Sequence, residues 1–202
     1  MPPQREELSL KPPKHLLDIF DAPAEQTLSE RILIYGLVMG LRPQRCLEIG
    51  THFGGSAVVI AAALDDIGRG KLHCLDPNPL IDEMTFQKIG HRAKIIRGNS
   101  PDDLIDVRNQ AGGHFDFVLI DGDHSYEGVS SDIDGMMNVV GNGTCILFHD
   151  ARNDEIRHAI DDSLVRFSDR LIDWGLIDVQ GVDETRENNI INWGGIRVLR
   201  VA

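Results

Sequence analysis

Positive charge, aromatic side chains and long apolar runs are all scarce in this sequence. Its 202 residues carry 20 Lys and Arg against 32 Asp and Glu, which gives a net charge of −12. Nucleic acids and anionic membrane surfaces are bound largely through Lys and Arg, so this balance argues against both as partners. No apolar run approaches the ~18 residues of a membrane span. Aromatic residues make up only 5% of the chain, which leaves little stacking surface for a large planar ligand.

Cysteine is also scarce, and its spacing excludes two roles. Cys46, Cys74 and Cys145 each lie in an expected core strand, and no CxxC pair occurs. This pattern predicts buried, reduced thiols rather than disulfides or a zinc site. The N-terminus is polar and proline-rich, unlike a signal peptide. We therefore expect a cytoplasmic protein.

Apolar runs alternate with amphipathic segments along the chain, which predicts α/β architecture. We read residues 1–25 as an N-terminal arm and residues 26–202 as one domain. Thr27 and Glu30 form a capping box that opens the first helix, and Ser100 reads as the N-cap of a later helix. Strands are expected at 46–49, 71–75, 93–97, 115–120, 144–148, 176–182 and 196–201. The first five, separated by helices, predict a Rossmann-like, doubly wound and mostly parallel sheet. The last two predict a C-terminal antiparallel hairpin with a polar loop at 183–192, giving seven strands in all.

The stretch RCLEIGTHFGGS, Arg45 to Ser56, has the order of a strand, a glycine turn and a helix. Such a turn lets the backbone approach a ligand closely at a helix N-terminus. A turn without any ligand is the alternative. The GxGxxG spacing of dinucleotide-binding folds is absent, and so is a Tyr-x-x-x-Lys pair. Both absences argue against a nicotinamide-dependent dehydrogenase.

Acids and histidines follow several of the expected strands. Asp76 follows the second strand, Asp121 the fourth, and His149-Asp150 the fifth. Ligands of open α/β sheets bind outside the carboxyl ends of the strands, so we expect these side chains to line a site. Asp76 can accept hydrogen bonds from a ribose diol, although an Asp-Pro turn also explains it. After the fourth strand, Asp123 has either a functional role or only a role as cap of the following helix. His124 is either a general base or substrate contact, or a surface histidine.

Two of these motifs carry a family resemblance. The order Glu48-x-Gly50-x-x-x-Gly54-x-Ser56 resembles the first motif of class I S-adenosylmethionine-dependent methyltransferases. The string FDFVLIDGDHSYEGV, Phe115 to Val129, resembles the fourth-strand motif of small-molecule O-methyltransferases of the family 24 type. The resemblance implies S-adenosyl-L-methionine as cofactor. It implies that the cofactor-binding residues are Glu48, Gly50, Thr51, Gly54, Ser56, Asp76, Asn99, Ser100 and Asp121.

A divalent metal is a second expectation. Catechol O-methyltransferase carries Asp-Asn where this chain has His149-Asp150, and Ala151 follows where the Asn ligand would be expected. We take Asp121, His149 and Asp150 as the candidate metal ligands. Oxygen ligands favour Mg²⁺, whereas ligation by His149 would favour Mn²⁺, Fe²⁺ or Zn²⁺. Alternatively, Asp150 only accepts hydrogen bonds from loop backbone.

The resulting hypothesis is methyl transfer to the hydroxyl of a small-molecule acceptor. Asp121, His124 and His149 are the candidate catalytic residues, and the arm and the 183–192 loop are expected to select the acceptor. The Asn/Asp-Pro-Pro-aromatic motif of many amino-methylating relatives is absent. Two rivals stay open: a metal-dependent hydrolase or hydroxylase on the same fold, and a non-catalytic S-adenosylmethionine-binding protein. The sequence does not decide the oligomeric state, and a homodimer is one option.

Overall fold

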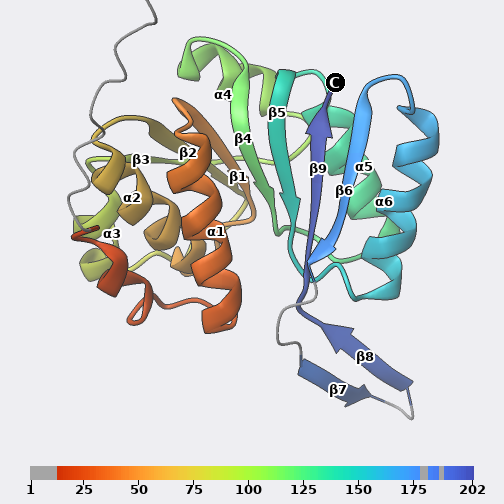
Figure 1. Cartoon of the computed structure of the whole chain (residues 1–202), viewed down its shortest axis with the longest axis horizontal. Coiled ribbons are helices and arrows are strands. Elements are labelled where there is room, and N and C mark those ends of the chain that lie inside the picture. The colour runs from red at the N-terminus through yellow and green to blue at the C-terminus, as the bar shows by residue number, and fades with distance from the viewer. Residues whose placement is uncertain (1–12, 178–181, 187–188) are drawn as a thin grey trace, which may run out of the picture.

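A seven-stranded sheet lies between two layers of helices in the computed structural model, which describes residues 13–177, 182–186 and 189–202 (Figure 1). The strand order is β3-β2-β1-β4-β5-β9-β6. Strand β9 runs antiparallel to both β5 and β6, and the remaining pairs are parallel. The predicted Rossmann-like sheet with a C-terminal antiparallel pair is confirmed. No helix among the described residues is long and apolar enough to cross a membrane.

The strands of this sheet are β1 (Arg45–Ile49), β2 (Lys71–Asp76), β3 (Ala93–Arg97), β4 (Phe115–Ile120), β5 (Val140–Phe148), β6 (Leu171–Ile177) and β9 (Ile196–Val201). The helices are η1 (Leu16–Ile19), α1 (Leu28–Leu41), α2 (Gly55–Ile67), α3 (Glu83–Ile89), α4 (Leu104–Ala111), α5 (Tyr126–Met136) and α6 (Asp154–Arg166). A separate two-stranded sheet consists of β7 (Val182–Arg186) and β8 (Asn189–Trp193).

Side chains alternate between two hydrophobic clusters, one on each face of the sheet. On β1, Cys46 belongs to the cluster under α1 and α2, whereas Leu47 belongs to the cluster under α4, α5 and α6. This is the period-two alternation of a strand buried on both faces. Cys74 and Cys145 are also buried in the first cluster, and all three cysteines are unpaired, as predicted.

The N-terminal segment packs onto the same core. Ile19 of η1 is fully buried, and the Asp66 carboxylate at the end of α2 accepts hydrogen bonds from the backbone of Lys14 and His15. Arg31 of α1 donates to four backbone carbonyls between residues 19 and 26. This segment is therefore fixed against α1 and α2, while the domain boundary at residue 25 stays a prediction.

The predicted helix cap is present at α1 but not at α4. Thr27 and Glu30 form the reciprocal capping box, and the Asn153 side chain caps α6. The Ser100 cap is wrong, because α4 begins only at Leu104 after Asp103. The Asp103 carboxylate accepts a hydrogen bond from the Asn99 backbone N–H in the turn that precedes α4.

The C-terminal segment differs from the prediction in two places. Strand β6 begins at Leu171 rather than at residue 176, and the rest of the expected 176–182 strand includes residues 178–181, which lie outside the described residues. The expected polar loop at 183–192 is mostly the β7–β8 hairpin. This hairpin projects beyond the carboxyl ends of the parallel strands (Figure 1). Its predominantly polar sequence lacks the apolar alternation that would have indicated strands.

Two glycines should respond oppositely to alanine. A Cβ on Gly55 would lie 2.3 Å from Ala24 Cα, whereas one on Gly36, exposed in α1, would meet nothing within 4 Å. We expect Gly55→Ala to displace the N-terminal segment and lower the free energy of unfolding by about 1–3 kcal/mol. Gly36→Ala should raise it by about 0.5–1 kcal/mol. Urea unfolding measures both, and equal effects of the two substitutions would contradict this packing.

Candidate active site

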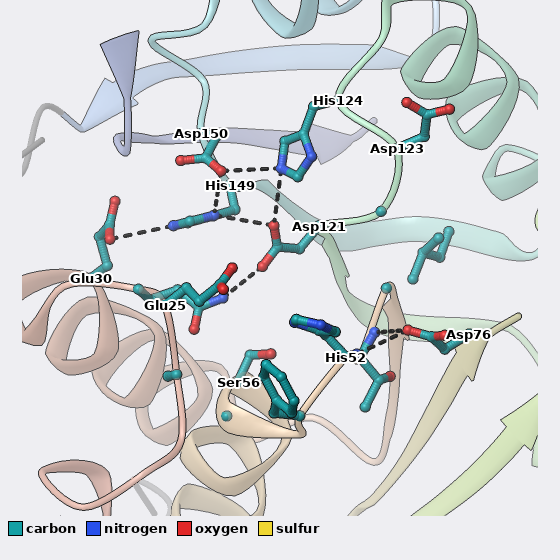
Figure 2. Close-up of a pocket in the computed structure, with 18 of the residues that line it drawn as sticks. Glu25, Glu30, His52, Ser56, Asp76, Asp121, Asp123, His124, His149 and Asp150 are labelled. Carbon is teal, nitrogen blue, oxygen red and sulfur yellow. Dashed lines mark hydrogen bonds and ion pairs between the residues drawn. The ribbon is translucent and has the colours of Figure 1, made fainter. Parts of the chain in front are cut away.

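A cavity of about 860 Å³ opens at the carboxyl ends of the central strands. It lies where the strand order reverses between β1 and β4, the usual ligand position in such sheets. Three further segments contribute to its wall: residues 23–27 before α1, the loop after β1, and Glu184 and Trp193 of the β7–β8 hairpin. Figure 2 shows the polar side chains that gather in this cavity.

The loop after β1 passes extremely close to the end of β4. Gly50 has φ +84°, and a Cβ at this position would lie 2.1 Å from the backbone oxygen of Asp121. Only glycine fits both the conformation and the space. Gly54, also at positive φ, is the N-cap of α2 and supplies no side-chain cap. The loop therefore leaves backbone groups at the start of α2 beside the cavity, as a ligand-binding turn requires.

Asp76 at the end of β2 holds this loop in place. Its Oδ2 accepts hydrogen bonds from the backbone N–H groups of Thr51 (2.8 Å) and His52 (2.9 Å), and its Oδ1 from that of Asn78 (2.7 Å). Burial raises the pKa of Asp76, but these three donors outweigh burial and hold the pKa below its ordinary value. A carboxylate has about four acceptor sites, so about one remains for a ligand.

Glu48 lies beneath the loop and does not line the cavity. Its side chain is fully buried, and its Oε2 accepts a hydrogen bond from Thr51 Oγ (2.9 Å). Its Oε1 has no hydrogen-bond partner among the described residues. Burial raises the pKa of Glu48 to about 7, even though hydrogen bonding from Thr51 lowers it. Glu48 therefore holds the Thr51 side chain from the buried side of the loop.

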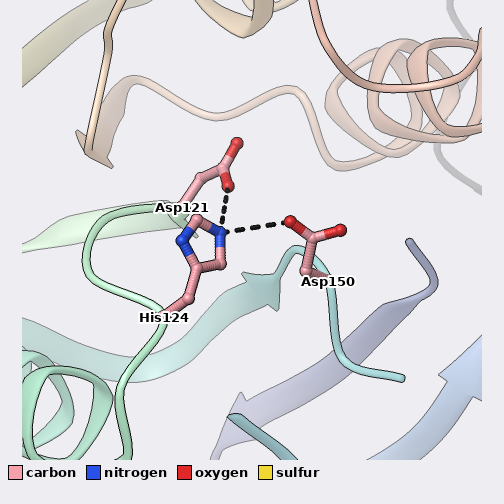
Figure 3. Close-up of side chains that lie close together, drawn as sticks. All are labelled: Asp121, His124 and Asp150. Carbon is pink, nitrogen blue, oxygen red and sulfur yellow. Dashed lines mark hydrogen bonds and ion pairs between the residues drawn. The ribbon is translucent and has the colours of Figure 1, made fainter. Parts of the chain in front are cut away.

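A cluster of carboxylates and histidines occupies the other side of the cavity. His149 Nδ1 lies 3.1 Å from Asp121 Oδ1 and 3.2 Å from Asp150 Oδ2. Its Nε2 lies 3.3 Å from Glu30 Oε2 on α1, an ion pair without hydrogen-bond geometry. His124 Nε2 lies 3.1 Å from Asp150 Oδ2 and 3.7 Å from Asp121 Oδ1. Figures 2 and 3 show the side chains converging from the ends of β4 and β5.

These contacts fix the charge states of the cluster. Burial alone would raise the pKa of Asp121 and Asp150, but the neighbouring histidines lower both pKa values well below the ordinary range. Hydrogen bonds to Asp121 and Asp150 raise the pKa of His124 to about 9. Burial lowers the pKa of His149, but the charge of Asp121 and the contacts with Asp150 and Glu30 raise it far more. At neutral pH the cluster therefore holds ionised carboxylates and protonated imidazoles.

Most of the predicted site residues meet in this cavity. It is lined by Gly50, Thr51, Ser56, Asp76, Asn99, Ser100, Asp121, His124, His149 and Asp150. Glu48 and Gly54, which the sequence also predicted as cofactor-binding residues, do not line the cavity. Asp123 also lines the cavity but does not cap α5, because the Ser125 side chain is the cap.

The expected metal set is arranged differently from the prediction. Ligand atoms of Asp121, His124 and Asp150 lie within 4.8 Å of one another (Figure 3). His149 faces carboxylates through both ring nitrogens, so a role as metal ligand or base would require one of these contacts to break. The backbone-binding alternative for Asp150 also holds in part, since its Oδ1 accepts a hydrogen bond from Gly194 N.

Sequence reasoning missed four residues of the site. Gln26 donates from Nε2 to Asp121 Oδ2 at 2.6 Å, and Glu30 contacts His149. Trp193 packs edge-on against His124, with the ring centroids 5.5 Å apart, and donates from Nε1 to Glu184. The sequence assigns Glu30 only to its capping box. Glu184 lies in the expected 183–192 loop, whereas Gln26 and Trp193 lie one residue outside the expected arm and that loop. The one available signal was that both segments were expected near the acceptor.

The raised pKa of Glu48 predicts a specific pH dependence. The native state holds the Glu48 proton more tightly than the unfolded chain, so the stability contributed by this group is lost as pH rises from about 4.5 to about 7. Glu48→Gln removes this titration. The stability of the variant relative to wild type should therefore increase over that window, by on the order of 2 kcal/mol. Urea unfolding at several pH values measures the difference, and a constant difference would contradict the assignment.

Comparison with known proteins identifies the family. Residues 47–151 match the model of a methyltransferase domain, methyltransferase family 24. Among curated proteins, none matches this chain. Solved structures resemble it at low identity, so they bear on the fold alone. One is an O-methyltransferase from Bacillus cereus in complex with SAH, 18% identical, covering 96% of this chain and 94% of that chain, with a TM-score of 0.67.

Two further structures show how widely the fold is used. The O-methyltransferase TomG from Streptomyces achromogenes, solved with SAM, is 16% identical, covers 96% of this chain and 92% of that chain, and has a TM-score of 0.66. The precorrin 8w decarboxylase from Methanobacterium thermoautotrophicum is 15% identical, covers 90% and 94%, and has a TM-score of 0.59. The family match spans more than half of the chain, including the loop after β1 and the ends of β4 and β5 that carry Asp121 and Asp150. The protein therefore belongs to methyltransferase family 24.

Proposed function

We propose that this protein is an S-adenosylmethionine-dependent O-methyltransferase that methylates a small-molecule hydroxyl with the help of a divalent cation. The observation that carries the proposal is that Asp121 contributes both to the glycine-loop side of the cavity and to the candidate metal ligands. Its backbone closes against Gly50 of the glycine loop, and its side chain belongs to the three-residue ligand group. A cofactor site and a cation site therefore share one wall of a single cavity.

The residues of the loop suit the cofactor. Gly50 and Gly54 keep side chains away from the start of α2, and Asp76 retains an acceptor for a ribose hydroxyl. Asn99 and Ser100 also line the cavity, after β3, which pairs with the Asp76 strand β2, so we expect them to contact the adenine. The cavity of about 860 Å³ has room for such a cofactor and a small acceptor together.

The ligand group suits a transition metal better than Mg²⁺. It offers two ionised carboxylates and, once a cation displaces the proton of His124, one neutral imidazole, a donor set that favours Mn²⁺, Fe²⁺ or Zn²⁺. His149, held between Glu30 and Asp121, stays positively charged beside the group and keeps both carboxylates ionised. We assign the ligand role to His124 in place of His149, because His124 is the histidine of the convergent group.

Deprotonation of the acceptor explains why a cation is needed. A hydroxyl is a poor nucleophile until its proton is lost. Within the cluster the carboxylates have lowered pKa values and the histidines raised ones, so none of these groups is an effective base at neutral pH. A bound divalent cation supplies positive charge that lowers the pKa of a nearby hydroxyl. The chain itself orients the acceptor beside Asp121 and shields it from water.

Cofactor binding can be tested at Asp76. We expect S-adenosylhomocysteine to bind the wild-type protein in calorimetric titration. Asp76→Ala should weaken binding by about tenfold or more, because it removes a ribose acceptor and frees three backbone donors of the loop. Asp106→Ala, on the exposed face of α4, is the matched control and should bind like wild type. Absence of binding to the wild-type protein would refute the proposed function.

Cation binding can be tested without any acceptor. We expect Mn²⁺, titrated while the free ion is followed by electron paramagnetic resonance, to occupy one site in the wild-type protein. His124→Gln and Asp150→Asn should each weaken that site by at least about tenfold, since each removes a ligand. Asp106→Asn is the control. Unchanged Mn²⁺ affinity in both ligand variants would rule out the assigned site.

A further inference from the structure

One buried carboxyl group of the cavity has no part in the interactions described so far. Asp132 of α5 lines the cavity and is only 5% exposed. Burial raises its pKa to about 6, and the charge of Asp123 adds to this rise, whereas the neighbouring Ser100 hydroxyl opposes it. At neutral pH the group is therefore mostly ionised. A buried carboxylate is costly unless donors surround it, so a ligand that brings donors would stabilise this one.

Asp132 lies between the turn after β4 and the turn after β3. A Cβ on Gly122, directly after Asp121, would lie 3.1 Å from Asp132 Oδ2. Three residues farther along α5, a Cβ on Gly135 would lie 2.3 Å from Pro101 Cβ. Residues three apart share a face of a helix, so this face of α5 packs against the turn that carries Ser100.

The Ser100 hydroxyl beside Asp132 is also without a role in the fold. Its Oγ is buried and has no hydrogen-bond partner among the described residues. It does not cap α4, which begins only at Leu104. A buried hydroxyl that bonds nothing is uncommon in a folded protein and indicates a group reserved for a ligand.

Asp123, the other acid of this region, is already engaged. Its Oδ1 accepts a hydrogen bond from the backbone N–H of Ser125 at 2.8 Å. Hydrogen bonding from Ser125 also holds the pKa of Asp123 below its ordinary value. Asp123 therefore orders the entry into α5, whereas the carboxylate of Asp132 and the hydroxyl of Ser100 are available to a ligand.

A carboxylate beside a hydroxyl matches one edge of adenine. The exocyclic amino group of adenine donates hydrogen bonds, and the ring nitrogens next to it accept them. Hypoxanthine reverses this pattern on its Watson–Crick edge, because it has an oxygen in place of the amino group and an N–H at the neighbouring ring position. A carboxylate would repel that oxygen, so the pair discriminates between the two bases.

We propose that Asp132 selects adenine in the cofactor site: its carboxylate accepts a hydrogen bond from the exocyclic amino group, and Ser100 Oγ donates to a neighbouring ring nitrogen. This inference rests on the proposed function and adds a residue of α5 to the cofactor-binding side chains. Asp76 is assigned to the ribose, so Asp132 is the specificity-determining residue for the base.

Two cofactor products that differ only in the base isolate this contact. S-adenosylhomocysteine carries the amino group, and S-inosylhomocysteine carries an oxygen in its place. Their dissociation constants are measured by calorimetric titration of the wild-type protein. We expect S-adenosylhomocysteine to bind at least about tenfold more tightly, because only its base offers a donor to the carboxylate.

Asp132→Asn keeps the size of the side chain but lets it either accept or donate. The amide can turn its N–H groups toward the oxygen of S-inosylhomocysteine, so the preference should fall to less than about threefold. Asp134→Asn, on an exposed side chain of the same helix outside the cavity, is the matched control and should keep the full preference. Should Asp132→Asn fail to fold, Ser100→Ala decides in its place and should lower the preference by at least about threefold.

Equal affinities of the wild-type protein for the two compounds, or a full preference retained by Asp132→Asn, would overturn the inference and leave the proposed function standing. Failure of the proposed function is seen separately, as absence of S-adenosylhomocysteine binding to the wild-type protein.

Discussion

Two mostly buried carboxylates at neighbouring strand ends need a positive charge between them, and His149 supplies it. Asp121 and Asp150 are held ionised by that imidazolium, and Glu30 balances it from the far side. Removing one partner would leave an uncompensated buried charge, which is far costlier than the intact group. Glu30 also accepts a hydrogen bond from Gly195 N at the turn into β9. The first helix, the central strands and the C-terminal turn therefore meet at one electrostatic group.

This electrostatic group is coupled to the glycine loop through the backbone. Gly50 passes so close to Asp121 that the loop and the strand end cannot move independently. Asp76 fixes the other side of the same loop through three backbone donors. A ligand of the loop and a ligand of the cluster would thus be held in a defined relative position, as in-line group transfer requires. The fold by itself hosts many reactions, so the functional argument rests on this juxtaposition.

The sequence predicted features with local causes and missed those with distant ones. The Thr27 capping box, the β1 strand and its glycine turn follow from neighbouring residues and were correct. Glu30 has a complete local explanation as part of the capping box, so its contact with His149, far along the chain, left no signal. Ser100 failed as a cap because α4 begins only after Asp103. The β7–β8 hairpin was read as a loop, because a ribbon outside the main sheet needs no buried apolar face.

The most direct test of the central claim is a crystal structure grown with S-adenosylhomocysteine and Mn²⁺, analysed with anomalous differences at the manganese edge. The account predicts a single strong manganese peak among Asp121, His124 and Asp150, with the nucleoside of the ligand against Asp76 in the same cavity. His149 should remain between Glu30 and Asp121. An empty cavity, or a manganese ion and a nucleoside at separate places on the protein, would contradict the account.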